Sequence, residues 1–268
     1  HEVQSPGESE EDVLAALDAA VAAFLDERVA AIGFGIPSNL ERGTRRVLHA
    51  TNLPLENIDL VARSRQRFGL PVAVENDASV AALAEWKRGA GRGSNNLVMF
   101  TLGTGVGGGI VIDGRLFRGW AELGHIVVQE CGPPCTCGGR GHLEVLASGH
   151  AADGAACELY GPDADAHLLI DRGHAGDAAA VEALARIGAS LGAAIGSLVN
   201  IFDPDLTVVG GGFGAAAGEL VLGPAREAAR REAIAPADET LRVVPAELGA
   251  EAGLVGAGLV GFEALVEH

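Results

Sequence analysis

Lysine is nearly absent from this chain. Lys87 is the only one among 268 residues, and Asp and Glu outnumber Lys and Arg by 36 to 19, which gives a formal net charge of −17 at pH 7. Proteins that hold nucleic acid neutralise its phosphates with clustered basic side chains. The composition therefore argues against nucleic acid as a partner of these residues.

Long apolar runs are absent too. No unbroken stretch of 18 or more apolar residues occurs, so the sequence predicts no membrane-spanning segment. The first residues, His1 to Pro6, are neither a signal peptide nor a natural start. With 48% hydrophobic residues and 39 glycines, the chain suits an α/β protein of one large or two modest domains with many tight turns.

Cysteine is scarce and unevenly placed. There are four cysteines, and three of them, Cys131, Cys135 and Cys137, are bunched in one short stretch. This distribution does not suggest a disulfide framework, and it indicates a metal site in a reducing cytoplasm.

The bunched cysteines lie between two histidines. His125, Cys135, Cys137 and His142 could supply four ligands to tetrahedral zinc, with Cys131 as the substitute if His142 points away. The other interpretation is a loop of reduced cysteines without metal.

Two carboxylates, Glu122 and Glu144, bracket this cluster and are not needed as metal ligands. They can therefore accept hydrogen bonds from a polyhydroxylated ligand.

Apolar periodicity predicts alternating helices and strands in the first third of the chain. We expect helices over residues 10–28, 58–68 and 77–86, strands over 29–36 and 71–74, and a loop between residues 37 and 57. This order predicts a parallel sheet with covering helices.

After a Gly/Ser/Asn break at 89–96, the second part opens with a predicted hairpin. The expected strands are 97–102, 108–112, 206–209 and 241–244, and the expected helices are 143–158, 177–202, 219–232 and 253–266.

Two glycine loops match dinucleotide patterns but lack their context. A strand follows Gly103–Gly107 where a Rossmann fingerprint requires a helix, and no ribose-binding acid follows the loop of Gly210, Gly211 and Gly212. As a hairpin turn, the first loop can instead point backbone N–H groups and the Thr104 hydroxyl at phosphate oxygens. A plain tight turn is the alternative for each loop.

Asp77 follows a predicted strand and opens a predicted helix. Ligands of α/β proteins gather at such strand ends, so Asp77 is a candidate general base for moving a hydroxyl proton, at a pKa near the ordinary ~3.9. It could also serve as the N-cap of the helix, and both roles can coexist.

These motifs together carry a family resemblance. Glu122-Leu-Gly-His125, followed by Cys135-Thr-Cys-Gly-Gly-Arg-Gly-His142-Leu-Glu144 and Ala-Ser-Gly, resembles the signature of the ROK family of sugar kinases and sugar-sensing repressors. The family has a cysteine where this chain has His142.

The resemblance implies roles for residues along nearly the whole chain. It implies a structural zinc on His125, Cys135, Cys137 and His142; a sugar contacting Asn52, Asn76, Asp77, Glu122, His125 and Glu144; and nucleotide on Gly103, Thr104, Gly105, Gly210, Gly211 and Gly212. Asp77 would be the catalytic base, and Asn52 could equally be a turn residue with no ligand.

The implied fold is two-lobed and actin-like, related to ribonuclease H, within the α/β class and with a zinc-binding loop insertion. We expect residues 1–92 and 253–268 to form the N-terminal lobe and residues 93–252 the C-terminal lobe. The implied activity is ATP- and Mg²⁺-dependent phosphorylation of a hexose in the cytoplasm, with glucose at its 6-hydroxyl as the first expectation. Mannose, fructose, N-acetylmannosamine and a polyphosphate donor remain open, and the family suggests a homodimer or homotetramer.

The two halves differ in one respect. The first half begins with a helix, and the family's first phosphate loop, Asp-x-Gly-Gly-Thr, is not present in these residues. We therefore expect an N-terminal segment to precede them. A basic helical domain there would indicate a repressor, whereas a hairpin with that loop would indicate a kinase.

Trp120 lies close to the motif in a segment, residues 118–122, that is a few residues shorter than in the family. We expect its ring to pack beneath the loop, with stacking on a sugar as the alternative.

Overall fold

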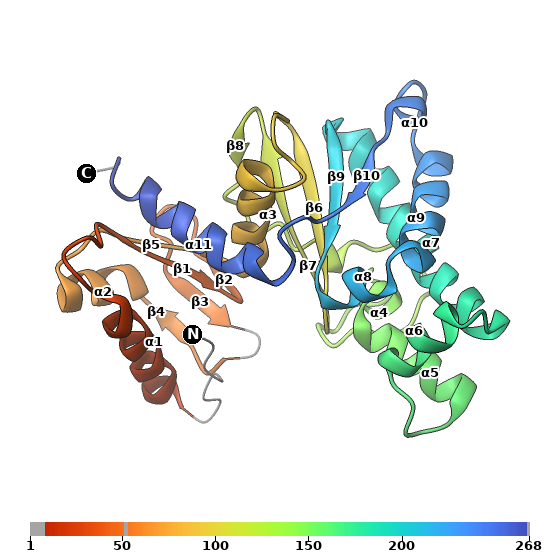
Figure 1. Ribbon diagram of the computed structural model, residues 1–268, viewed down its shortest axis with the longest axis horizontal. Helices are drawn as coiled ribbons and strands as arrows, with labels where there is room; N and C mark the ends of the chain where they lie inside the picture. The colour runs from red at the N-terminus through yellow and green to blue at the C-terminus, as the bar shows by residue number, and fades with distance from the viewer. Residues whose placement is uncertain (1–8, 51–52, 267–268) are drawn as a thin grey trace. The chain divides into compact units, whose positions relative to one another are not determined.

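The computed structural model describes residues 9–50 and 53–266. The chain divides into two compact units, whose elements are labelled in Figure 1. The first unit comprises His1–Ala84, Arg118–Trp120 and Glu251–His268, and the second comprises Glu85–Phe117 and Ala121–Ala250.

The first unit contains two small sheets and their covering helices. Its elements are α1 (Glu10–Phe24), β1 (Ile32–Ile36), β2 (Ser38–Leu40), β3 (Val47–Ala50), β4 (Glu56–Ile58), α2 (Leu60–Phe68), β5 (Val72–Asn76), the first part of α3 (Asp77–Arg88) and α11 (Ala252–Glu263).

Strands β1 and β5 pair in parallel, from Ile32 opposite Val72 to Ile36 opposite Asn76. The register brings the carboxyl ends of both strands, and the residues that follow them, to one edge.

The prediction of a loop over residues 37–57 is wrong. Strands β2, β3 and β4 form an antiparallel sheet there. Each has only three or four residues, and the register shifts at Asn39 and Leu40, so the segment lacks a period that sequence reading could detect.

Helix α11 packs on β1 and β5 at very short range. A Cβ on Gly33 of β1 would lie 1.8 Å from the carbonyl oxygen of Ala257, so only glycine permits this approach. The apolar core of this unit includes Phe34, Val47 and Leu60.

Helix α1 is shorter than predicted. Ser9 caps its start by accepting a hydrogen bond from the Asp12 amide at 3.1 Å, and the chain leaves the helical conformation at Leu25 instead of continuing to residue 28.

The second unit is built on one five-stranded sheet with the order β10-β9-β6-β7-β8. Its strands and 3₁₀ turns are β6 (Leu97–Leu102), β7 (Val106–Ile112), β8 (Arg115–Leu116), β9 (Leu206–Gly210), β10 (Val243–Pro245), η1 (Leu123–His125) and η2 (Gly249–Glu251). Its helices are α4 (Glu144–Ala147), α5 (Gly149–Tyr160), α6 (Ala166–His174), α7 (Ala178–Phe202), α8 (Gly212–Ala217), α9 (Glu219–Glu232) and α10 (Ala237–Thr240), together with the end of α3.

Strand β6 is the centre of this sheet. It pairs antiparallel with β7 and parallel with β9, and its nearly continuous apolar sequence is buried along almost its whole length. The predicted hairpin is therefore present.

The predicted helix over residues 143–158 is interrupted. Ser148 adopts an extended conformation and its hydroxyl accepts a hydrogen bond from the Ala151 amide at 3.2 Å, which starts α5 after the single turn of α4. Helix α6, which was not predicted, follows within the next segment.

Helix α7 is the long core helix and packs along α9 (Figure 1). By length and composition α7 could cross a membrane, but a buried core helix passes the same test, and half of its most apolar window is buried. Leu184, Leu191 and Ile195 are fully buried.

Candidate active site

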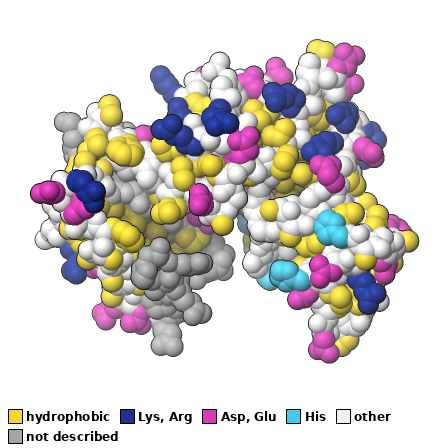
Figure 2. All heavy atoms as spheres, in the orientation of Figure 1, with side chains coloured by type: hydrophobic (Ala, Val, Ile, Leu, Met, Phe, Trp, Pro, Cys, Tyr) yellow, Lys and Arg dark blue, Asp and Glu magenta, His cyan; other side chains and the backbone are white. Residues whose placement is uncertain are grey.

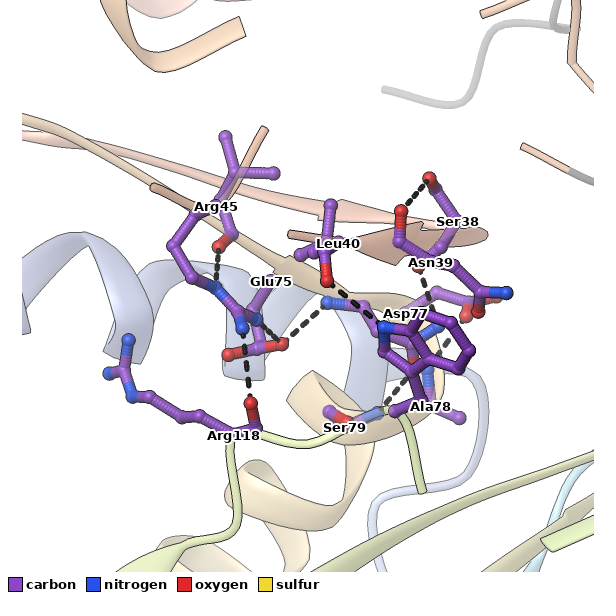
Figure 3. Close-up of polar contacts among 12 residues, drawn as sticks. Ser38, Asn39, Leu40, Arg45, Glu75, Asp77, Ala78, Ser79 and Arg118 are labelled. Carbon is purple, nitrogen blue, oxygen red and sulfur yellow. Dashed lines mark hydrogen bonds and ion pairs between the residues drawn. The ribbon is translucent and has the colours of Figure 1, made fainter. Parts of the chain in front are cut away.

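The end of β5 and the start of α3 carry three consecutive polar residues, Glu75, Asn76 and Asp77 (Figure 3). The Asn76 side-chain oxygen accepts a hydrogen bond from the Ser79 amide at 3.0 Å, so Asn76 caps α3. The suggestion that Asp77 is the N-cap is therefore wrong. Asp77 instead accepts a hydrogen bond from the adjacent Ala78 amide at 2.8 Å.

Asp77 is exposed to solvent. Surrounding protein nevertheless disfavours its charge and raises its pKa, while the Ala78 amide acts in the opposite direction. The expectation of an ordinary pKa is corrected to a raised one. A raised pKa suits a general base that must accept a proton near neutral pH.

Asn76 and Trp120 line a small recess in the first unit, together with Ser38, Asn39, Arg45 and Glu75. Trp120 is 57% exposed as a residue, and its Nε1 donates to the carbonyl oxygen of Leu40 at 3.1 Å. The expectation that this ring packs beneath the loop is therefore wrong.

Sequence reasoning missed Asn39, Arg45 and Glu75. Glu75 adjoins the recognised Asn76-Asp77 pair, which is a signal that could have drawn attention to it. No local signal identifies Arg45, because its partners are distant in the chain.

In the second unit, four potential metal ligands converge. The ligand atoms of His125, Cys135, Cys137 and His142 all lie within 4.8 Å of one another. A tetrahedral zinc has Zn–S of ~2.3 Å and Zn–N of ~2.0 Å, so the donor set fits zinc and the four ligand atoms are close enough together to share one ion after a small contraction. Cys131 is exposed and is not in this group.

Tight backbone geometry holds the cluster together. The Cys135 amide donates to Gly139 O at 2.8 Å, and Gly141 has a φ of +64°. A Cβ at Gly141 would lie 1.7 Å from Gln129 O, which only glycine avoids. Burial raises the pKa of the Cys135 thiol, and metal binding would oppose this by favouring the thiolate.

Glu144 connects the cluster segment with the glycine hairpin. One of its carboxylate oxygens accepts a hydrogen bond from the Val106 amide at 3.0 Å, and a Cβ on Gly105 would lie 2.4 Å from the same oxygen. Glu144 therefore lies directly against the loop between β6 and β7. Glu122 immediately precedes η1, which contains His125.

The two glycine loops meet at one pocket of the second unit. This pocket, of about 440 Å³, is lined by Gly103 and Thr104 from the first loop and by Gly212 from the second. Gly211 packs on the backbone of Leu102, and Gly105 and Gly210 do not line the pocket. The volume lies within the range of small-molecule sites.

His150, Asp153 and His167 also line this pocket. They come from α5 and α6, and their spacing in the chain contains no ligand pattern. Only the packing of these two helices brings them together.

The model of the ROK family matches residues 1–261. The chain belongs to the ROK family. The glucokinase of Thermotoga maritima is 36% identical over 248 residues, which cover 85% of this chain and 78% of that protein. The xylose repressor of Caldicellulosiruptor bescii is 29% identical, over 84% of this chain and 60% of the repressor.

Solved structures agree with this ROK assignment. The ROK hexokinase of Thermus thermophilus has a TM-score of 0.88 and 35% identity, covering 99% of this chain and 91% of that one. The ROK glucokinase of Streptomyces griseus, in complex with glucose and AMPPNP, has a TM-score of 0.83 and 35% identity, covering 98% and 91%. The predicted family and the actin-like α/β fold are confirmed.

The predicted site residues thus lie in two groups. Asn76 and Asp77 are adjacent in the first unit, and the cysteine–histidine cluster, Glu122, Glu144 and the glycine loops belong to the second. Asn52 lies outside the described residues.

Proposed function

We propose that this ROK protein is an ATP-dependent hexose kinase that converts glucose to glucose 6-phosphate. The glucokinase and hexokinase relatives support hexose phosphorylation, and the AMPPNP in one related structure supports a nucleotide donor. The observation that carries the proposal is the accessible carboxyl group of Asp77 at the carboxyl end of a parallel strand, next to an asparagine that already caps the helix.

Asp77 acts as the general base. The 6-hydroxyl of the sugar transfers its proton to the Asp77 carboxylate as its oxygen bonds to the γ-phosphorus and the bond to ADP breaks. The transition state of phosphoryl transfer is loose, so alignment of the hydroxyl contributes more than a strong base does.

The sugar contacts proposed here are those of the residues that the family resemblance indicates. Asn76 uses its oxygen to cap α3, and its amide nitrogen donates one hydrogen bond to Ser38 O at 3.4 Å, which leaves its second N–H as the donor for a sugar hydroxyl. Glu122, His125 and Glu144 accept or donate the remaining hydrogen bonds, and Asn52 is an additional candidate.

The nucleotide is assigned to the pocket lined by Gly103, Thr104 and Gly212, with Gly105, Gly210 and Gly211 shaping its two loops. Mg²⁺ prefers oxygen ligands. Among the described residues, the group of three or more candidate ligands is the cysteine–histidine cluster, which does not suit Mg²⁺. A magnesium ion would therefore be held mainly by nucleotide phosphates.

The direct test is phosphate transfer to a panel of hexoses. We expect ADP formation with glucose to exceed that with mannose, fructose and N-acetylmannosamine, and ATP to be preferred over polyphosphate. Asp77→Asn keeps the side-chain size and the oxygen facing Ala78, so it should bind sugar but lose roughly 10²–10⁴-fold in kcat. Turnover of the variant at the wild-type rate would remove Asp77 as the base.

Zinc is assigned a structural role at His125, Cys135, Cys137 and His142, where it would cross-link the loop and fix the His125 ring. We expect about one zinc per chain, and loss of most of it in the Cys135→Ser/Cys137→Ser variant, measured by elemental analysis. Cys131→Ser is the matched control and should retain the metal. Equal zinc content in all three proteins would refute the site.

A sugar-sensing repressor is the second candidate, because xylose repressors are among the relatives. Asp77 and the shared pocket of the glycine loops favour the enzyme. Hexose-dependent ADP formation would decide for the kinase, and sugar binding without turnover would favour the sensor. The cytoplasmic location, a role in glycolysis and a homodimeric or homotetrameric state stay predictions.

A further inference from the structure

Arg45 lies in the turn between β2 and β3 but directs its side chain into the protein (Figure 3). The turn is closed by hydrogen bonds from Glu41 N to Arg46 O at 2.9 Å and from Arg45 N to Glu41 O at 3.0 Å. Arg45 has a φ of +59°, which is uncommon for a residue other than glycine. Only 13% of its side chain remains exposed.

The guanidinium group of Arg45 bonds to three separate acceptors. Nε donates to Val74 O at 3.4 Å, Nη1 donates to Arg118 O at 3.5 Å, and Nη2 forms an ion pair with the carboxylate of Glu75. The planar guanidinium presents its donors in a fixed fork that spans separate acceptors, whereas a lysine ammonium is a compact point charge with rotatable donors. One side chain therefore connects the end of β5 with the segment Arg118–Trp120.

Glu75 links Arg45 to the backbone of Asn76, which precedes the proposed catalytic Asp77. The carboxylate oxygen that pairs with Arg45 also accepts a hydrogen bond from the Asn76 amide at 2.9 Å. Asn76 in turn caps α3 at the point where Asp77 begins the helix. The Arg45–Glu75 pair is thus one hydrogen bond from the backbone of the residues assigned to the sugar.

The segment Arg118–Trp120 is attached to the same unit at three points. Arg45 holds the carbonyl of Arg118, the Arg118 side chain pairs with Glu263 of α11, and Trp120 donates to Leu40 O. Trp120 and Asn76 line the same recess as Arg45 itself, and the backbone acceptors of Arg45, Val74 O and Arg118 O, each lie two residues before one of them in the chain.

Burying the Arg45–Glu75 ion pair costs desolvation free energy that offsets much of the attraction between the two charges. Glu75 is 1% exposed, and its second carboxylate oxygen has no hydrogen-bond partner among the described residues. Burial raises the pKa of Glu75 and lowers that of Arg45, although each group favours the charge of the other. Apolar residues often replace such buried pairs at no loss of stability, which points to a role in arranging neighbouring groups.

We propose that Arg45, together with Glu75, is a positioning residue that holds the Asn76–Asp77 backbone and the Trp120 segment in register around the acceptor sugar. This inference rests on the proposed hexose kinase function. Arg45 and Glu75 touch no reacting atom. They act through the main chain of Asn76 and Arg118.

The test compares Arg45→Met with Arg45→Met/Glu75→Gln. The single variant leaves a buried carboxylate unpaired and should lower the melting temperature. Glutamine in the double variant still accepts the Asn76 N–H but carries no charge, so the melting temperature should largely recover. Arg230→Met is the control, because Arg230 is an exposed arginine of α9 in the second unit whose side chain has no hydrogen bond or ion pair in the described structure.

Two readouts separate positioning from folding. In the double variant, kcat/KM for the hexose should stay roughly 10- to 100-fold below wild type, while KM for ATP is unchanged because its proposed pocket contains none of these residues. The emission of Trp120, obtained by subtracting the spectrum of the matching Trp120→Phe protein, should shift to longer wavelength without sugar. Wild-type kcat/KM and emission in the stable double variant would overturn the proposal.

Failure of the proposed function gives a different result. If wild-type protein turns over no hexose, the kinase assignment fails. The positioning role is then tested by the emission of Trp120 without sugar alone. A shift in the double variant, but not in Arg230→Met, then supports it, and an unchanged spectrum overturns it.

Discussion

Three adjacent residues, at the end of β5 and the start of α3, have three different structural roles. Glu75 is buried against Arg45, Asn76 caps α3, and Asp77 presents an accessible carboxyl group. Because a strand alternates its side chains and a helix begins immediately afterwards, consecutive positions face different surroundings. Because Asn76 caps the helix, the carboxyl group of Asp77, the proposed base, is not needed for capping.

The raised pKa of Asp77 predicts the acid limit of activity. Asp77 must be ionised to act as a base, and the surrounding protein raises its pKa above the ordinary ~3.9. We therefore expect kcat/KM for hexose to fall tenfold per pH unit once the pH is below this raised pKa. The measurement is a pH profile at saturating nucleotide, with the KM for ATP followed in parallel as the control. A rate that stays constant down to pH values below ~3.9 would contradict this assignment.

At the scale of elements, α11 depends on glycine to pack closely against α3. A Cβ at Gly256 would lie 1.8 Å from the carbonyl oxygen of Val80, whereas nothing lies within 4 Å of a Cβ at Gly258. Both glycines lie within the same helix, so they differ in their surroundings and share the same helix propensity.

This contrast gives a paired prediction. Gly256→Ala should destabilise the protein by about 1–3 kcal/mol, because helix and backbone must separate. Gly258→Ala should be neutral or stabilise by up to about 1 kcal/mol, since alanine favours the helix without a clash. Chemical denaturation measures both, and equal effects of the two substitutions would show that α11 does not pack this closely.

At the scale of the whole molecule, acidic charge dominates. The formal net charge is −17, and Figure 2 shows acidic and basic side chains interspersed over the visible face. Few basic side chains are available to offset the excess, so repulsion among carboxylates opposes the compact state.

Salt should therefore stabilise this protein. Raising NaCl from about 20 to 200 mM shortens the screening length to below ~10 Å, and we expect a gain of about 1 kcal/mol, or roughly 2–4 °C in Tm. Calorimetry measures the shift, and an equal osmolality of sucrose serves as the control for non-ionic effects. A Tm that falls with NaCl would mean that attractive ion pairs outweigh the net repulsion.

Much of the architecture was readable from local patterns. Amphipathic helices such as α2 and α9, the buried strand β6 and its hairpin with β7 have the periods and turn residues that predict them. The short strands β2 to β4 escaped detection because three or four residues do not establish a period. The break at Ser148 also escaped, since a side-chain cap there outweighs a continuous helical pattern.

The sequence by itself determined the family, the donor set of the cysteine–histidine cluster and the candidacy of Asp77, because these depend on residue types at short spacings. Only the tertiary structure decided that Asn76 is the cap, that Trp120 is exposed, that the two glycine loops share one pocket and that Arg45 reaches Glu75. The Asn76 cap is local, but either Asn76 or Asp77 could have capped the helix, and only the backbone conformation chose between them. The other contacts join residues far apart in the chain, so packing of the whole unit must bring them together before their roles can be recognised.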